Sequence, residues 1–391
     1  MTVRVNKSSF NIREKLSELE RPIGLKGSEL MKAETAQEAR DLVSAGRKNL
    51  VINGDMRISQ RGTSFTPATE FGYTLDRWIT FLSQTGSFNV TQETTSPPNG
   101  FTHYLRVTST AATSSITGRN LLCQMVEGFN LAPTKWGFSD AKPCKISFWV
   151  RSSLPGKHGF TIVDTSQRPC FGKGYYINQA NTWEYKEIFV PPATFGDFSL
   201  NTNGIGCWLF WDMGSASGYD VPVEGIWNDT QNDYSVPGTV DIIATNGATF
   251  DITGVQLEVG KNATEFEHRS YGEELALCQR YYQILEIPLN SYGAQYATVG
   301  SGLFAGLPLT FITKMRTAPT SITYEHISGT EYWVQASTTA FSGTGGAGRT
   351  FGYTNSSVKI QQTRVSGNNT PSGSSYYIWE ASFKLLLSSE L

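Results

Sequence analysis

The sequence is short of charged residues and of long apolar runs. Charged residues make up 17% of its 391 residues and leave a net charge of −2, whereas soluble domains usually carry ~25% charged residues. A near-neutral chain lacks the basic surplus that binding to nucleic-acid phosphates requires, so we expect no nucleic-acid partner. The sequence also contains no apolar run near the ~20 residues of a membrane-spanning helix, so we expect no membrane insertion.

The cysteines lack the spacing of a metal site or a disulfide framework. There are five of them, and no two form a Cys-x-x-Cys pair. Zinc sites need paired ligands at short spacing, and disulfide frameworks are dense in small secreted domains. We therefore expect no cofactor and free, buried thiols at Cys123, Cys144, Cys170, Cys207 and Cys278.

The residues that are abundant favour strands and tight turns. The chain has 38 glycines, 12% aromatic residues and 39% hydrophobic residues, which are enough to form a core. The predicted fold class is mainly β. We expect short N-terminal helices, a jelly-roll-like β-sandwich, a linking helix and a C-terminal β domain.

Residues 1–47 have a helical pattern. One set of apolar residues recurs every three or four positions, which places it on one narrow face of a helix. A capping box at Thr35–Glu38 begins a second short helix. Because short helices are marginal in isolation, we predict that this segment anchors the chain to a partner, through the seam of Ile12, Leu16, Leu19 and Ile23.

Residues 48–268 have the period-two pattern of strands, with breaks every 8–12 residues, which predicts a two-sheet sandwich. In Lys145–Arg151 the apolar residues alternate with polar ones. The alternation changes phase at Gly254, where we predict a β-bulge. Cys207–Trp211 is apolar on both faces, which predicts a central strand covered on both sides.

Residues 269–288 are predicted to form the linking helix. A capping box at Ser270–Glu273 begins it, and its apolar residues again form a narrow seam, which we expect to serve as an oligomer contact. The seam residues are Leu275, Cys278, Tyr282 and Leu285. Residues 289–391 then form the predicted β tip domain.

Two groups of residues are candidates for glycan binding. Trp149 occupies the polar phase of its strand beside Arg151, so we expect it to be exposed or to lie in a cleft. In the tip, four aromatic residues flank loops such as Ser366–Gly373, and Tyr, Ser, Gly and Asn together form adaptable recognition surfaces. These residues are Tyr332, Trp333, Tyr353 and Tyr376. The alternative for both groups is packing under a loop or between protomers.

Metal and catalytic sites have weaker support. Asp55 and Asp251 lie near the first and last strands of the sandwich, and we expect a structural calcium ion there if those strands are neighbours. Residues 343–348 match Gly-x-Gly-x-x-Gly, but strand and turn residues follow them, so a loop is predicted. Asp212, Asp220 and Glu224 are candidates for a carboxylate pair. We expect no enzymatic activity.

Five segments together resemble a module common in the fibre proteins of tailed bacteriophages. They are Asn49–Gly62, Thr74–Trp78, Ile252–Gly260, Ala263–Glu267 and Glu274–Tyr282. The sandwich also resembles the jelly-roll carbohydrate-binding modules, through its opening Asn-Gly-Asp (53–55), its Phe-Trp-Val-Arg-Ser (148–152), its Thr-Trp-Glu-Tyr (182–185) and a late Asp-Ile (251–252).

The resemblance implies a structural protein of the virion. Such a protein is usually a homotrimer. Its N-terminal segment docks on other virion proteins of the tail, collar or capsid, and its distal part contacts a host-surface glycan. We therefore predict a tail fibre that binds glycan without covalent chemistry. Two alternatives remain: a head fibre or decoration protein on the capsid, and a polysaccharide depolymerase.

Overall fold

The computed structural model describes residues 48–391 apart from 67–70, 84–85, 114, 288–291, 294, 297–303, 336–339, 343–348, 354–355 and 364–375, and gives no side chains for 287–309, 324–355 and 357–383. Residues 49–391 form one compact unit. The predicted anchoring seam of Ile12, Leu16, Leu19 and Ile23 lies outside the described residues and stays a prediction. In the described part, no helix has the length and apolar character needed to cross a membrane.

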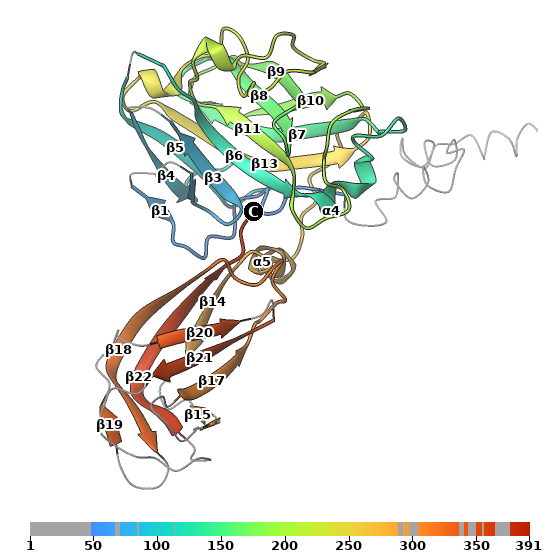
Figure 1. Cartoon of the computed structure of the whole chain (residues 1–391). Coiled ribbons are helices and arrows are strands. Elements are labelled where there is room, and N and C mark those ends of the chain that lie inside the picture. The colour runs from blue at the N-terminus through green and yellow to red at the C-terminus, as the bar shows by residue number, and fades with distance from the viewer. Residues whose placement is uncertain are drawn as a thin grey trace, which may run out of the picture. The chain divides into compact units, whose positions relative to one another are not determined.

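Two antiparallel sheets face each other and form the predicted jelly-roll-like sandwich (Figure 1). One has six strands in the order β1 (Ser64–Phe65), β4 (Ser87–Glu93), β5 (Tyr104–Ala111), β13 (Thr249–Val259), β7 (Cys144–Ser152) and β10 (Glu184–Val190). The other has seven, in the order β12 (Trp227–Asn228), β9 (Cys170–Ile177), β8 (Gly156–Asp164), β11 (Ile205–Asp212), β6 (Asn120–Glu127), β3 (Trp78–Leu82) and β2 (Gly72–Tyr73).

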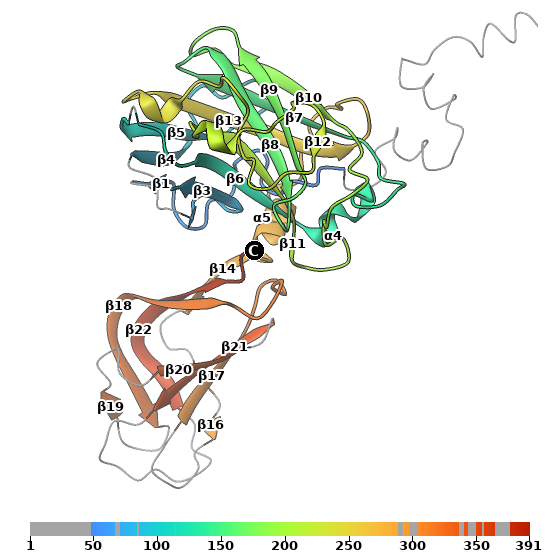
Figure 2. The same cartoon turned by 45° about the horizontal axis from the view of Figure 1, so that its top comes forward.

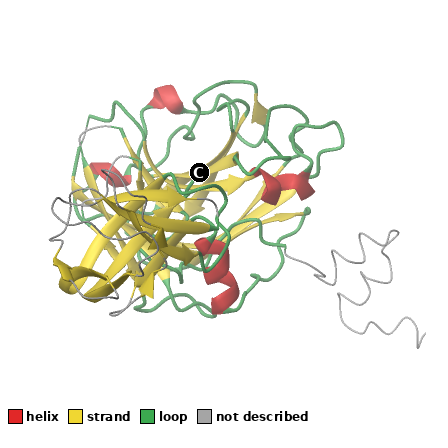
Figure 3. Ribbon diagram, turned by 60° about the horizontal axis from the view of Figure 1, so that its bottom comes forward, coloured by secondary structure: helices red, strands yellow, loops and turns green. Residues whose placement is uncertain are grey.

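Helices are few in the described part of the chain (Figure 3). The sandwich carries α4 (Gly128–Leu131) and three single-turn helices, η1 (Ala132–Thr134), η2 (Ser217–Tyr219) and η3 (Ile242–Ala244). The mainly β fold class that composition predicted is therefore confirmed, because nearly all regular structure of the described residues is strand.

The core of the sandwich follows the predicted alternation. Ile146, Phe148 and Val150 of β7 point between the sheets and are fully buried. Strand β11 pairs with both β6 and β8, and its Trp208 and Trp211 are 9% and 0% exposed. The prediction of a central, doubly covered strand is confirmed, because aromatic residues of this strand pack on both sides of its sheet. All five cysteines are free and buried, as predicted.

The predicted bulge is present in β13. The register between β13 and β7 shifts between Thr253 and Gln256, and Gly254 has a φ of 64°. A left-handed conformation favours glycine, because other residues pay a steric penalty there. The bulge therefore returns the apolar residues after Gly254 to the core face.

The predicted linking helix is wrong in its length. Helix α5 spans Tyr271–Gln279, and the Oγ atom of Ser270 accepts a hydrogen bond from the backbone N–H of Glu273, as the capping box predicted. Tyr282 and Leu285 lie instead in strand β14 (Tyr282–Ile287), which pairs with β22 (Tyr376–Ser388). The reason is tertiary: β22 supplies hydrogen-bond partners along this segment, which is rich in aromatic and β-branched residues.

The helix residues do not form an exposed oligomer seam either. Cys278 is fully buried against Ile52, Ile58 and Tyr281 of the same chain, and Leu275 packs on this cluster. Tyr282 and Leu285 are also buried, at 5% and 7% exposure. The narrow apolar face is therefore covered within the protomer.

A second β region follows α5 (Figure 2). One sheet runs in the order β14, β22, β18 (Ser321–Gln335) and β19 (Ala340–Ser342), and β15 (Tyr292–Gly293) also pairs with β22. A second sheet runs β16 (Gln295–Tyr296), β17 (Phe304–Thr310), β21 (Ser357–Thr363) and β20 (Arg349–Tyr353). This region begins at residue 282, earlier than the predicted start of the tip at 289.

The five segments that carry the phage-fibre resemblance meet in one buried hydrogen-bond network. The backbone N–H of Leu257 donates to the Oδ1 atom of Asn49, and the indole N–H of Trp78 donates to the backbone oxygen of Asn53. Arg269 donates to the backbone oxygen of Asn49 (2.5 Å), to Glu267 (2.8 Å) and to Glu274 (3.2 Å). Glu274 also accepts from the backbone N–H of Asn53 at 2.5 Å. These residues therefore join the start of the sandwich to α5, which is a structural role rather than a binding role.

Candidate functional site: a groove on the six-stranded sheet

A groove of about 620 Å³ lies on the outer face of the six-stranded sheet. This volume falls within the ~300–1,000 Å³ range of small-molecule sites. Its lining is largely aromatic, with several polar groups among the rings. The residues are Phe101, Ser147, Trp149, Tyr185, Gly254, Ala263, Thr264, Glu265, Phe266 and His268.

The floor of the groove includes a pair of aromatic rings on neighbouring strands. Trp149 of β7 and Tyr185 of β10 are direct cross-strand partners. Their ring centroids lie 5.4 Å apart at an interplanar angle of 50°. Trp149 is half-buried and Tyr185 is 40% exposed. The predicted placement of Trp149 in a cleft thus agrees with the structure.

The hydroxyl of Tyr185 keeps its proton at neutral pH. Partial burial raises the pKa of Tyr185 above its ordinary value of 10, and a hydrogen bond with Ser147 acts in the opposite direction. The groove floor therefore offers a phenolic O–H that both donates and accepts.

One wall of the groove depends on the bulge. The ring of Phe101 packs directly over Gly254, so that a Cβ at this position would lie 2.6 Å from the Cζ atom of Phe101. Phe101 continues the wall through ring contacts with Phe266 at 5.1 Å and with His268 at 5.3 Å. Gly254 thus permits the close approach of the wall to the sheet.

Two buried polar side chains, Glu258 and Gln256, accept hydrogen bonds from the segment that carries Phe266 and His268. Glu258, which is 4% exposed, accepts from the backbone N–H of Thr264 at 2.8 Å and from its hydroxyl at 2.7 Å. Gln256 accepts from the backbone N–H of Glu267 at 2.8 Å. Buried and satisfied polar networks rigidify their surroundings, so the groove is largely preformed.

Arg151 does not line the groove, which corrects its predicted role beside Trp149. Its Nε donates to Asp251 at 2.7 Å, and its guanidinium lies over the rings of Tyr104 and Trp183. Arg106 donates to both oxygens of the same carboxylate, at 2.7 and 3.0 Å. Because Asp251 is 1% exposed, its charge needs close cations, and the two arginines supply them.

The two carboxylates predicted to bind calcium, Asp55 and Asp251, form ion pairs with arginines. Asp251 is bound as described, and Asp55 forms an ion pair with Arg57. Within the described part of the chain, no three His, Cys, Asp or Glu side chains gather as metal ligands do. Nothing in this geometry supports a calcium site, and it stays a prediction.

The other predicted residues are not among the described lining residues of the groove. Tyr332 and Trp333 are in β18, Tyr353 is in β20 and Tyr376 is in β22, and their side chains lie outside the described residues. The proposed carboxylates do not line the groove: Asp212 is buried and accepts from Ser215 and Thr239, Glu224 pairs with Lys157, and Asp220 accepts from Ser235. The loop at residues 343–348 lies outside the described residues.

Sequence reasoning missed most of the lining. Tyr185 carried a usable signal in the sequence, because it belongs to the Thr-Trp-Glu-Tyr segment (182–185) that resembles carbohydrate-binding modules. The structure places it on β10, which pairs with the strand of Trp149. No sequence signal marked the other aromatic residues of the lining, Phe101, Phe266 and His268, because they come from irregular segments far apart in the sequence. Their meeting depends on the pairing of β13 with β5 and β7.

Comparisons with known proteins bear on the fold alone. No family model matches the sequence, and no curated protein matches it. Among solved structures, the chain is similar to the enzymatically active domain of tailspike protein 4 of Bacteriophage CBA120, at 13% identity and a TM-score of 0.29. The match covers 54% of this chain and 21% of the tailspike chain, so this protein corresponds to about a fifth of that neighbour's length.

Two carbohydrate-binding modules match over almost their whole length. TmCBM61, solved with β-1,4-galactotriose, shows 12% identity over 55% of this chain and 100% of its own, with a TM-score of 0.27. A family 11 module from Clostridium thermocellum, solved with a β-1,3-1,4-mixed-linked tetrasaccharide, shows 12% identity over 53% and 98%, with a TM-score of 0.27.

Proposed function

We propose that the groove binds a glycan by non-covalent contact. The observation that carries this proposal is the pairing of Trp149 with Tyr185 on the floor of a preformed groove of about 620 Å³. Aromatic rings that face a groove offer flat apolar surface to the C–H faces of sugar rings, at little cost in side-chain entropy.

The polar groups of the groove suit sugar hydroxyls. Ser147 and Tyr185 carry hydroxyls, and Glu265 places a carboxylate among the lining residues. No arginine or lysine lies among the described lining residues, so the groove favours neutral sugars over acidic ones. The groove therefore combines stacking surface with hydrogen-bond partners of both kinds.

Binding without hydrolysis fits this lining better than catalysis. Glycoside hydrolysis uses two carboxyl groups across the scissile bond. Glu265 is the single carboxylate among the described lining residues. A depolymerase would release reducing sugar from polysaccharide, and we expect no such release.

The test compares variants of the full chain on a glycan array, followed by calorimetry with the neutral oligosaccharide that scores highest. We expect Trp149→Ala and Tyr185→Ala each to weaken binding at least tenfold, because truncation of a central aromatic anchor of a binding site costs about 2 kcal/mol or more. Tyr176→Ala is the matched control, since Tyr176 is 62% exposed on β9 of the other sheet. Equal affinity of Trp149→Ala and the control would refute the proposal.

We further propose that the chain is a fibre protein of a tailed-bacteriophage virion. The support is the set of segments described above, from Asn49–Gly62 to Glu274–Tyr282, which form one network in the structure. On this proposal residues 1–47 dock on other virion proteins, and the groove contacts the host-surface glycan. Cryo-electron microscopy of the particle would place the chain on the tail or, on the alternative proposal, on the capsid. Its absence from the particle would refute both.

Trimerisation would strengthen such binding. Linked weak sites gain avidity when several engage one surface. Because the α5 residues are covered within the protomer, we propose that a homotrimer contact would use other surfaces, including residues 1–47. Light scattering of the purified chain gives the copy number directly, and a monomeric mass would refute the trimer.

A further inference from the structure

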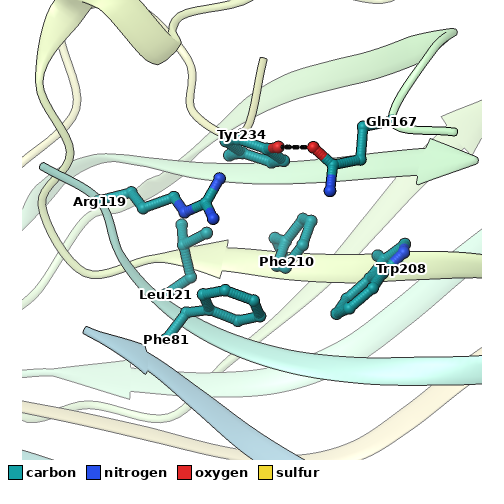
Figure 4. Close-up of a pocket in the computed structure, with 7 residues that line it drawn as sticks. All are labelled: Phe81, Arg119, Leu121, Gln167, Trp208, Phe210 and Tyr234. Atoms are coloured by element: carbon teal, nitrogen blue, oxygen red, sulfur yellow. Dashed lines mark hydrogen bonds between the residues drawn. The ribbon is translucent and has the colours of Figure 1, made fainter. Parts of the chain in front are cut away.

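The opposite sheet carries a second feature with the chemistry of a binding site. A small niche lies on the outer face of the seven-stranded sheet, and we name it the Arg119 niche. It is lined by Phe81, Arg119, Leu121, Gln167, Trp208, Phe210 and Tyr234 (Figure 4). Its volume is about 10 Å³, roughly the space of one water molecule. The niche can therefore admit one oxygen atom of a ligand's polar group, and the rest of the ligand would remain outside it.

Arg119 is unusual in its electrostatic surroundings. Every other arginine whose side chain the structure describes donates to a carboxylate, except Arg316, which donates to backbone carbonyl oxygens. The guanidinium of Arg119 instead lies against aromatic rings, with its Cζ atom 4.5 Å from the ring centroid of Tyr234 and 4.9 Å from that of Phe81, and it donates a hydrogen bond to the hydroxyl oxygen of Tyr234. This cation has no anionic partner within the described part of the chain.

A second donor approaches the niche from the other side. The single proton of the Tyr234 hydroxyl has two acceptors within reach, the Oε1 atom of Gln167 and the Oδ1 atom of Asn232 at 2.8 Å. With Oε1 facing this hydroxyl, the amide nitrogen of Gln167 has no partner among the described residues. Figure 4 shows the guanidinium of Arg119 and the amide of Gln167 directed toward the niche from opposite sides, with Phe210 between them. Burial raises the pKa of Tyr234 and the charge of Arg119 lowers it, and the net result is a raised value that keeps the donor hydroxyl protonated.

Exposed aromatic surface lies next to these donors. Phe71, which is 47% exposed, contacts Phe81 edge to face at 4.8 Å and Trp208 at 6.3 Å. A ligand with its charged group in the niche could thus rest an apolar face on the ring of Phe71. A planar guanidinium and an amide N–H together match the oxygens of a carboxylate.

We propose that the Arg119 niche is a second ligand site, which binds the carboxylate of an acidic sugar. The site lies on the opposite sheet from the groove, so one sandwich would contact neutral and acidic sugars on two faces. The charge complementarity favours an acidic ligand here, whereas the described lining of the groove lacks a cation.

The test uses methyl β-D-glucuronide and methyl β-D-glucoside, two probes that differ only at the exocyclic carbon C6, which is a carboxylate in the first and a hydroxymethyl group in the second. Saturation-transfer NMR with the full chain measures the affinity of each. We expect the glucuronide to bind, to weaken at least tenfold in Arg119→Gln, and to weaken with rising salt because the contact is ionic. Trp149→Ala should leave this binding unchanged, which separates the niche from the groove.

A second variant guards against misfolding of the first. Gln167→Glu keeps an acceptor for Tyr234 and replaces the amide on the other side of the niche from Arg119 with a negative charge, so we expect repulsion of the ligand carboxylate and loss of glucuronide binding. Unchanged affinity in both variants, loss of glucuronide binding in Trp149→Ala, or no binding to the wild-type chain would each overturn the proposal. Equal affinity for N-acetylglutamate would overturn the assignment to a sugar.

Discussion

Removal of Arg77 should destabilise the junction between the sandwich and the residues that follow β22. The Arg77 side chain is 1% exposed and pairs with Glu390, whose side chain is 5% exposed. Arg77 also donates to the backbone oxygen of Met125 at 2.7 Å, and its guanidinium lies 3.7 Å from the ring centroid of Tyr281. Nearly every polar contact of this side chain is therefore made away from water.

The magnitude follows from the burial of both charges. Removal of one partner of a buried ion pair costs about 3–5 kcal/mol, because the other charge stays buried without compensation. Arg61 also contacts Glu390, at 3.0 Å, and we expect this pair to remain in an Arg77→Met variant. We therefore expect a loss of about 3 kcal/mol, at the lower end of that range.

The assay is urea unfolding followed by tryptophan fluorescence, with a double-mutant cycle of Arg77→Met and Glu390→Leu. We expect the double variant to lose less stability than the sum of the single variants, by about 1–3 kcal/mol. Lys135→Gln is the control, because Lys135 and Asp140 form an exposed pair, 49% and 61% exposed, and it should leave the midpoint unchanged. Additive losses in the cycle would refute the argument that the two charges compensate each other.

Three further changes test other parts of the structure. Gly254→Ala should cost about 1–2 kcal/mol of stability in thermal melts and weaken glycan binding, because it forces a side chain into a left-handed conformation against Phe101. Glu258→Gln should lower glycan affinity in calorimetry and leave the melting temperature nearly unchanged, since it loosens Thr264 in the groove wall. An affinity equal to that of the wild type would contradict this role. Burial raises the pKa of Asp212 from 3.8 to about 6, so the folded chain holds this proton to higher pH than the unfolded chain does. Stability should therefore fall by about 2 kcal/mol as pH rises from 4 to 6, and urea titrations should show this slope in the wild type but not in Asp212→Asn.

Local patterns predicted several features of the sandwich correctly. The alternation in Lys145–Arg151 placed Phe148 in the core and Trp149 on the outer face, and the change of phase in β13 marked the bulge at Gly254. The capping box at Ser270–Glu273 marked the start of α5. Each of these features depends on neighbours within a few residues, which the sequence displays directly.

The same local reasoning failed where two structures fit one pattern. Tyr282 and Leu285 continue the helical spacing of Leu275 and Cys278, yet the segment Tyr282–Ile287 is also rich in the aromatic and β-branched residues that strands favour. Pairing with β22, about a hundred residues later in the chain, decided the outcome. A prediction from periodicity cannot include that partner, because its register is set by the tertiary fold.

Polar partners were likewise beyond local inference. Arg151 was predicted to serve a glycan because it shares a face with Trp149, and Asp251 was predicted to bind calcium. The structure pairs them with each other, because β7 and β13 are neighbours in the sheet. A buried carboxylate takes the nearest cation, and only the strand order decides which cation is near. The amino-acid order set which face each side chain occupies, and the packing of distant strands chose its partners and thereby formed the groove.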